Sequence, residues 1–360
     1  MNRRDLLKYA GTGVLAGALY GSVGKVLAAT LPGNGESDRV QNVSGKTPIS
    51  LIIDDGSPVD PLFYELPGYE TPFLVPAEFT KRVADTFDKF NLHGKFTLIP
   101  MPSCLGRIDQ SLQRVPQDHL EAFLKIMRER IAPRFDITPE FLTHLCAYDL
   151  KTGKYKRHLF EDTWISQAPP EEIVEYFTLA FQILKNVGIE STGITSPWVS
   201  GIDVEKKYAK ALGDAQWNLF KRKLTWYFLY AASDSEKPFQ CSVEYKDVER
   251  GQTVVSVPSN AGDIFWSMEL PNKKDRVKMI NDGIDRLVSP DGRTGRIRQL
   301  IETGYPVVLV SHWQSLYTQG TELGLEGLSA LAERIQKVFG SSLEWVTCSE
   351  MARRYAASKS

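Results

Sequence analysis

Apolar and polar positions alternate along the chain in blocks, and one block organises the rest. The run 49–53 is almost wholly aliphatic and ends on two adjacent carboxylates, Asp54 and Asp55, which are followed by the turn residues Gly56 and Pro58. An aliphatic run without polar alternation is typical of a parallel strand covered on both faces. Chemistry in α/β proteins collects at the carboxyl ends of such strands, although an isolated Asp-Asp-Gly can also be only a polar turn.

Blocks of helical spacing alternate with short apolar runs through the rest of the chain. Between 79 and 90, phenylalanine and valine recur at steps of three and four, which indicates one buried helix face. Other helices are predicted at about 117–131, 170–187, 203–220, 274–288, 293–303 and 324–339. Other strands are predicted at 94–100, 140–148, 192–197, 224–231, 305–311 and 343–348.

This alternation predicts an α/β fold with right-handed crossovers between parallel strands. We expect a distorted (β/α) barrel of about seven units over 47–360, with an inserted β-rich segment near 240–268. An open doubly wound sheet is the alternative. A dinucleotide-binding fold has little support, because no Gly-x-Gly-x-x-Gly follows the first strand. The long loop 59–75 is expected to line a cleft.

The first 29 residues have the features of a twin-arginine signal peptide. Arg3 and Arg4 precede a mild apolar stretch, and small residues near Ala28 suit cleavage. The stretch is too short and too rich in glycine for a stable membrane span. We therefore predict a signal peptide at 1–29, a linker at 30–46 and a periplasmic or secreted mature protein; an uncleaved anchor is the alternative.

Overall charge and cysteine usage exclude some classes of protein. The formal net charge of −1 argues against nucleic acid or an anionic membrane as the main partner and favours a neutral or mildly polar substrate. The cysteines are scattered without a Cys-x-x-Cys pair, which excludes a zinc ribbon and a dense disulfide framework. They stand at Cys104, Cys146, Cys241 and Cys348.

Several chemically capable side chains stand at predicted strand ends. His144 and His312 are two of only five histidines, so their position is informative, although a histidine can also be a hydrogen-bonded core residue. Trp198 and Trp313 follow the strands at 192–197 and 305–311. If the strand ends converge on one rim, these residues meet Asp54 and Asp55 there.

The order of these motifs resembles the polysaccharide deacetylase family, metal-dependent enzymes that remove acetyl groups from N-acetylated sugars on a distorted barrel. The family's strand ending in Asp-Asp-Gly matches 54–56, and its final Leu-x-His is approximated by 309–312. Its His-x-x-x-His is matched by His144, with Tyr148 in place of the second histidine. Its Arg-x-Pro-aromatic motif is matched by Thr-Ser-Pro-Trp at 195–198, without the arginine.

The resemblance implies a role for each matching residue. Asp55 and His144 would bind a divalent metal, with zinc expected, and Asp54 would act as the catalytic base. His312 would protonate the leaving amine, a role that suits an imidazole. The substrate-binding side chains would be Tyr148, Trp198 and Trp313. The substrate would be an N-acetylated carbohydrate, and the reaction hydrolysis of a non-peptide carbon–nitrogen bond.

The departures from the family pattern leave questions open. Two metal ligands are fewer than a catalytic zinc usually takes, and the missing arginine would have held Asp54. Nearby side chains that could complete the metal site are Cys146, Asp149, His158 and Glu161. A non-catalytic glycan-binding barrel and a glycoside hydrolase stay as alternatives. The latter needs a second acid facing Asp54 or Asp55, for which the candidates are Glu65, Glu140 and Asp263.

Overall fold

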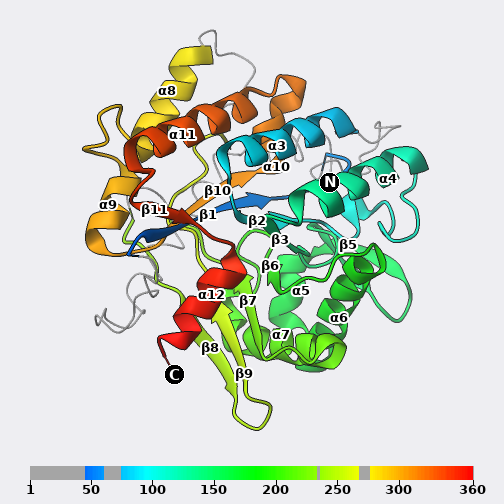
Figure 1. Cartoon of the computed structure of the whole chain (residues 1–360). Coiled ribbons are helices and arrows are strands. Elements are labelled where there is room, and N and C mark those ends of the chain that lie inside the picture. Colours follow the sequence, from blue (N-terminus) through cyan, green and yellow to red (C-terminus); the bar gives the residue numbers. More distant parts are fainter. Residues whose placement is uncertain (1–44, 61–73, 233–235, 267–275, 360) are drawn as a thin grey trace.

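Parallel strands lie at the centre of the molecule (Figure 1), in two sheets that isolated bridges join into a ring. The computed structural model describes residues 45–60, 74–232, 236–266 and 276–359. Neighbouring strands of the ring run parallel. In their order around it, these strands are β1 (Thr47–Asp54), β2 (Gly94–Thr97), β3 (Phe135–Thr138), β6 (Gly193–Thr195), β7 (Leu224–Phe228), β9 (Gln252–Ser256) and β10 (Val307–His312).

Two isolated parallel bridges close this ring. One joins Glu140, just beyond β3, to Thr195 of β6, and the other joins Ala261, beyond β9, to Leu309 of β10. The strands therefore form a distorted barrel with two weakly paired seams. The predicted fold class is confirmed, and the open doubly wound alternative is wrong.

Four further strands lie outside the ring. Two of them make an antiparallel hairpin next to the end of β3, one pairs antiparallel with β9, and one pairs parallel with the start of β1. In the same order they are β4 (Cys146–Asp149) with β5 (Lys154–Phe160), β8 (Ser242–Asp247) and β11 (Leu343–Trp345).

Helices surround the ring of strands (Figure 1). The first described helix, α3 (Ala77–Phe90), buries Phe79, Val83 and Phe87 on one face and is capped at its C-terminus by Asn91, whose left-handed backbone (φ 51°) is a common helix stop. No helix among the described residues is long and apolar enough to cross a membrane. The helices are α3 (Ala77–Phe90), α4 (Gln117–Ile126), α5 (Glu161–Gln167), α6 (Pro170–Asn186), α7 (Glu205–Phe220), α8 (Arg276–Leu287), α9 (Arg296–Thr303), α10 (Trp313–Tyr317), α11 (Leu323–Phe339) and α12 (Cys348–Ala357).

Three expectations about the elements need correction. The strand predicted at 140–148 is wrong: the barrel strand β3 ends at Thr138, and a loop separates it from β4. The β-rich segment near 240–268 is not only an insertion, because β9 is a strand of the barrel and only β8 lies outside it. Helix α12 was not predicted. Most of the loop at 59–75 and the whole predicted signal peptide lie outside the described residues.

Candidate active site

The two adjacent aspartates stand at the carboxyl end of β1, as predicted. Asp54 ends the strand, and Asp55 has a positive φ of 61°, which turns its side chain away from the strand direction. The following Gly56 is required sterically, since a Cβ there would lie 2.0 Å from the carbonyl oxygen of Thr97. The Asp-Asp-Gly sequence thus lets two neighbouring carboxylates take different roles.

A buried lysine holds Asp54. The Nζ atom of Lys95 and the Oγ1 atom of Thr97, both on β2, each lie 2.6 Å from Oδ1 of Asp54. Lys95 is completely buried, and its ammonium also lies 4.8 Å from the centroid of the Phe228 ring. The expectation that Asp54 lacks a cation because the family's arginine is missing is therefore wrong. Lys95 supplies the positive charge from a different strand.

Asp55 meets two other buried ionisable groups, Glu140 and His144. Ligand atoms of the three residues all lie within 4.8 Å of one another. His144 Nδ1 is 2.9 Å from Glu140 Oε1 and 3.5 Å from Asp55 Oδ1. The amide of Gln314 donates to the other oxygen of Asp55. The three residues are only 1–4% exposed, so they are buried away from bulk solvent.

One contact of the cluster favours a bound divalent cation without reference to any family. Glu140 Oε2 is buried and has no hydrogen-bond partner among the described residues. A buried carboxylate oxygen without a partner costs free energy, and coordination of a metal ion would remove that cost. Two carboxylates and one imidazole are also ligands that divalent ions take in proteins.

The electrostatics of the cluster also favour a bound cation. Burial raises the pKa of the Glu140 carboxyl to about 8. Burial also disfavours the charged form of His144, but the charges of Asp55 and Glu140 prevail and raise its pKa to about 10. Although burial opposes it, the charges of His144 and His312 hold the pKa of Asp55 below its usual value. The carboxylates thus need a cation between them, which a protonated His144 or a metal ion can provide.

The loop that carries Glu140 and His144 is held in place by hydrogen bonds to Glu161 of α5. One oxygen of the fully buried Glu161 accepts from the backbone N–H groups of Leu142 and Thr143, both at 3.0 Å, and from the Tyr176 hydroxyl at 2.7 Å. Burial raises the pKa of Glu161 to about 7. Glu161 therefore positions the ligand loop and is not itself a ligand.

The second family motif was placed four residues too late. The sequence Glu140-Phe-Leu-Thr-His144 has the spacing of His-x-x-x-His with glutamate in the first position, so His144 matches the second histidine of that motif. This spacing is visible in the sequence, although the sequence-based hypothesis for Glu140 is the acid of a glycoside hydrolase. The proposed third ligands Cys146, Asp149, His158 and Glu161 do not join the cluster.

His312 lies beside the cluster at the end of β10. Its Cα pairs with that of Asp54 in the parallel register of β1 and β10. Asp263 Oδ2 is 2.8 Å from His312 Nδ1 and accepts the backbone N–H of His312 at 3.1 Å. Although burial lowers it, the hydrogen bond to Asp263 raises the pKa of His312 to about 9. Asp263, a second residue considered only as a glycoside hydrolase acid, thus orients His312.

The three predicted sugar-binding aromatics occupy different environments. Trp198 is partly exposed, and its ring centroid lies 5.1 Å from that of His144. Tyr148 instead packs against Tyr155 of the β4–β5 hairpin, at 5.2 Å between centroids. Trp313 is fully buried and donates its indole N–H to the Ser57 carbonyl oxygen at 2.9 Å. The prediction that Trp313 binds substrate is wrong, because no ligand reaches its ring.

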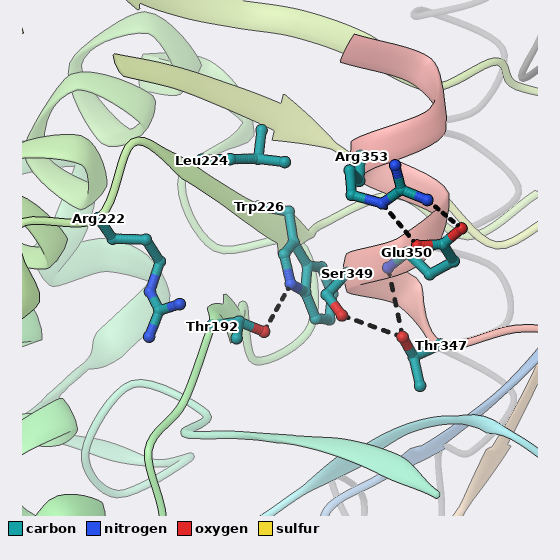
Figure 2. A pocket seen from close by; sticks show the side chains of 8 residues that line it. All are labelled: Thr192, Arg222, Leu224, Trp226, Thr347, Ser349, Glu350 and Arg353. Carbon is teal, nitrogen blue, oxygen red and sulfur yellow. Dashed lines mark hydrogen bonds and ion pairs between the residues drawn. The ribbon is translucent and has the colours of Figure 1, made fainter. Parts of the chain in front are cut away.

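A cavity of about 430 Å³ lies at the opposite, amino-terminal end of the strands (Figure 2). Its arginines already have acidic partners: Arg353 pairs with Glu350 at 2.7 Å, and Arg222 pairs with Glu190 at 2.5 Å. The cavity contains no residue of the cluster at the carboxyl end. Its lining residues are Thr192, Arg222, Leu224, Trp226, Thr347, Ser349, Glu350 and Arg353.

Comparisons with known proteins find similarity in structure only. No family model and no curated protein matches the chain. A candidate polysaccharide deacetylase from Mycobacterium smegmatis matches at a TM-score of 0.50 and 14% identity, over 89% of this chain and 94% of that one.

Two other solved structures match at lower scores. The Bc1960 peptidoglycan N-acetylglucosamine deacetylase matches at a TM-score of 0.41 and 14% identity, over 85% of this chain and 88% of that one. The peptidoglycan deacetylase PdaC from Bacillus subtilis matches at 0.40 and 10% identity, over 87% and 94%. The match at a TM-score of 0.50 confirms, at the level of the fold, the resemblance inferred from the motifs. The chain has the fold of the polysaccharide deacetylases, as a divergent example of it.

Proposed function

We propose that this protein is a metal-dependent hydrolase that removes acetyl groups from an N-acetylated glycan. The observation that carries the proposal is the buried cluster of Asp55, Glu140 and His144, with an unpartnered Glu140 oxygen, next to Asp54 and His312. Beside a second carboxylate and an imidazole, this unpartnered oxygen is a place where a bound cation would remove the free-energy cost of burial.

Asp55, Glu140 and His144 would hold the ion. A divalent cation there would polarise the acetamide carbonyl and acidify water. Zinc is the ion that we expect from the resemblance, and a second carboxylate in place of an imidazole also favours harder ions such as Mn²⁺.

Asp54 is suited to accept a proton from the attacking water. Lys95 and Thr97 both donate to the Oδ1 atom of Asp54, so we assign the proton transfer to Oδ2. The two bonds fix the carboxylate in one orientation, which a general base within reach of a bound water requires. Asp54 is not a member of the ligand cluster, so its Oδ2 atom stays available for this role.

His312 is suited to protonate the leaving amine. Its pKa of about 9 keeps the imidazole protonated at neutral pH, and Asp263 fixes Nδ1, which leaves Nε2 to deliver the proton. Asp263 thereby acts as a positioning residue. Trp198, next to His144, is the aromatic face that best supports contact with a sugar ring.

The glycoside hydrolase alternative loses support from the same contacts. Its candidate acids Glu140 and Asp263 are each committed to a histidine, at 2.9 and 2.8 Å. Glu65, the other candidate, lies outside the described residues. A pair of carboxylates flanking a glycosidic bond would have to be free to act as acid and nucleophile or base.

Acetate release tests the proposal. Protein purified without chelator should release acetate from chitohexaose, lose this activity with EDTA and recover it with added Zn²⁺ or Mn²⁺. A protein that binds chitohexaose equally well with and without EDTA, and releases no acetate with either ion, would instead be the non-catalytic glycan-binding barrel.

We also propose export in folded form through the twin-arginine route. Arg3 and Arg4 before a glycine-rich apolar stretch support it, and a metal site loaded before export would explain the route. Changing both arginines to lysine should leave precursor in the cytoplasm; mature protein outside the cytoplasm would contradict the proposal.

A further inference from the structure

We propose that Gln314 is a positioning residue for the metal ligand Asp55 and that it controls which ions the site accepts. Through its hydrogen bond to one oxygen of Asp55, Gln314 would leave only the other oxygen for the ion. The site would then favour small divalent ions such as Zn²⁺ and Mn²⁺ over Ca²⁺. The inference rests on the proposed function, because it concerns the ion of the proposed reaction, but ion binding can be measured without turnover.

The two carboxylate oxygens of Asp55 face different partners. Oδ2 accepts a hydrogen bond from the side-chain amide of Gln314 at 2.5 Å. Oδ1 is the oxygen that lies 3.5 Å from Nδ1 of His144. Asp55 is only 3% exposed, so its carboxylate is buried away from bulk solvent. An amide therefore holds one oxygen of Asp55, while the other faces a ligand of the proposed metal site.

The fold keeps Gln314 in reach of Asp55. Gln314 is the second residue of α10, which begins directly after β10. The residue before it, Trp313, donates its indole N–H to the carbonyl oxygen of Ser57 at 2.9 Å. Side chains of two successive residues thus bind the loop after β1. Because Trp313 is fully buried in a close-packed core, the start of α10 is fixed against this loop.

The rest of the Gln314 amide shows what a glutamine adds at this position. Its Oε1 atom is buried and has no hydrogen-bond partner among the described residues. A buried amide oxygen without a partner costs free energy. A methionine would have a similar length and would avoid this cost, but it could not donate to Asp55. The donor to Asp55 is thus the contribution that an apolar side chain could not make.

The sequence motifs assign no role to Gln314. The last motif that resembles the polysaccharide deacetylase family ends at His312, two residues earlier. Gln314 is also neither an acid nor a histidine, so it does not belong to the ligand cluster itself. Its role follows from the contact with Asp55, which lies 259 residues away in the chain.

The number of oxygens that Asp55 gives to the ion affects which ion fits. Ca²⁺ takes roughly six to eight oxygen ligands and often binds both oxygens of a carboxylate. Zinc takes about four ligands, of which a catalytic site leaves one to water. With Oδ2 held by Gln314, Asp55 would offer a single oxygen, beside Glu140 and His144. Three protein ligands of this kind suit a small ion and leave a position for the water that hydrolysis needs.

The test measures ion selectivity. Competition against a chelating dye would give Kd for Zn²⁺, Mn²⁺ and Ca²⁺ in the native protein and in Gln314→Met, which cannot donate to Asp55. Trp313→Phe is the matched control, because it removes the neighbouring bond to Ser57 and leaves the bond to Asp55 in place. Circular dichroism would check that each variant is folded.

We expect Gln314→Met to bind Zn²⁺ and Mn²⁺ about tenfold more weakly than the native protein and Ca²⁺ at least as tightly. The ratio of Kd for Ca²⁺ to Kd for Zn²⁺ should therefore fall about tenfold, whereas Trp313→Phe should keep the native ratio. An unchanged ratio in Gln314→Met would overturn the proposal. The same fall in Trp313→Phe would also overturn it, because the effect would then come from the position of α10.

A structure of the native protein with bound Zn²⁺ or Mn²⁺ tests the same claim if Gln314→Met does not fold. We expect the ion on Oδ1 of Asp55 alone, with Oδ2 still hydrogen-bonded to Gln314. An ion held by both oxygens of Asp55, or a broken bond between Asp55 and Gln314, would overturn the proposal.

Acetate release by the native protein, assayed in parallel, separates the possible failures. Acetate release together with native ion selectivity in Gln314→Met would refute the role of Gln314 and leave the proposed reaction standing. Altered selectivity in Gln314→Met without acetate release by the native protein would do the reverse. A native protein that binds none of the three ions would overturn both proposals.

Discussion

The two ends of the barrel use the same residue types in opposite ways. At the amino-terminal end, Asp136 of β3 accepts from the backbone N–H of Ser349 at 2.7 Å and from its hydroxyl at 2.8 Å, which fastens α12 to the barrel. At the carboxyl end, Glu140 shares a histidine with Asp55 and keeps one oxygen without a partner. Both oxygens of Asp136 therefore accept hydrogen bonds that hold the fold together, whereas Glu140 keeps one oxygen that a ligand can complete.

Left-handed backbone conformations have different roles at the two ends: before β2 and β7, Asn91 and Lys221 end the helices α3 and α7. Asp55, His144 and Trp198, all at the carboxyl end, have positive φ values of 61°, 62° and 53°. Such conformations cost free energy in residues other than glycine and persist where the surroundings enforce them. At this end the fold places side chains for chemistry at the expense of local stability.

The largest expected effect is at the carboxyl end. Asp54→Asn and His312→Ala should each lower turnover by roughly 10²- to 10⁴-fold, because they remove the proposed base and acid. Circular dichroism should show a folded protein in both cases. Native rates in either variant would remove that residue from the acid–base pair.

At the amino-terminal end we expect a loss of stability without a loss of activity. Asp136→Ala removes the acceptor for Ser349 and should lower the free energy of unfolding by about 1–3 kcal/mol. Asp136→Asn is the matched control, because its amide oxygen can still accept. Denaturant titration measures the free energy of unfolding of both variants. A large fall in turnover per folded molecule would contradict a purely structural role for the amino-terminal end.

A third prediction uses pH. His312 must carry a proton to donate one, and its pKa is raised to about 9, so turnover should decline as pH rises through about 9. Asp263→Asn removes the carboxylate that stabilises the protonated form, which should move this decline to lower pH. A pH–rate profile that is the same in the variant would show that Asp263 does not act through His312.

The smallest effect is expected at the rim. Trp198→Ala should raise KM for an N-acetylated oligosaccharide about three- to tenfold through loss of an aromatic face, with little change in turnover. Trp313→Phe, in the core, is the contrasting variant and should lower stability instead. A change of KM in Trp313→Phe alone would reverse this assignment.

Periodicity was sufficient to predict the barrel, the aspartates at the end of β1 and the position of His312, because long amphipathic helices and aliphatic strands leave strong patterns. It failed around Glu140. The apolar residues after Glu140 imitate a strand, whereas the true strand β3 is only four residues long and includes the polar Asp136. The shift concealed the Glu140-x-x-x-His144 spacing.

The roles of Lys95 and Asp263 were not predicted because they depend on tertiary contacts. Lys95 is a lysine inside a strand, and nothing local indicates that its ammonium is buried against Asp54, 41 residues away. Asp263 and His312 are 49 residues apart in sequence and meet only through the closure of the barrel between Ala261 and Leu309. Pairings of this kind depend on the assembled ring and have no periodic signature.

The central claim is that Glu140 completes a metal site with Asp55 and His144. The most direct measurement is the metal content of protein purified without chelator, by mass spectrometry, and its affinity for added Zn²⁺ and Mn²⁺, in the native sequence, in Glu140→Gln and in Tyr148→Phe. The account predicts that one ion binds per native chain, that Glu140→Gln loses it or binds it at least tenfold more weakly, and that Tyr148→Phe keeps it. Equal metal affinity in Glu140→Gln, or loss of the ion in Tyr148→Phe, would contradict the account.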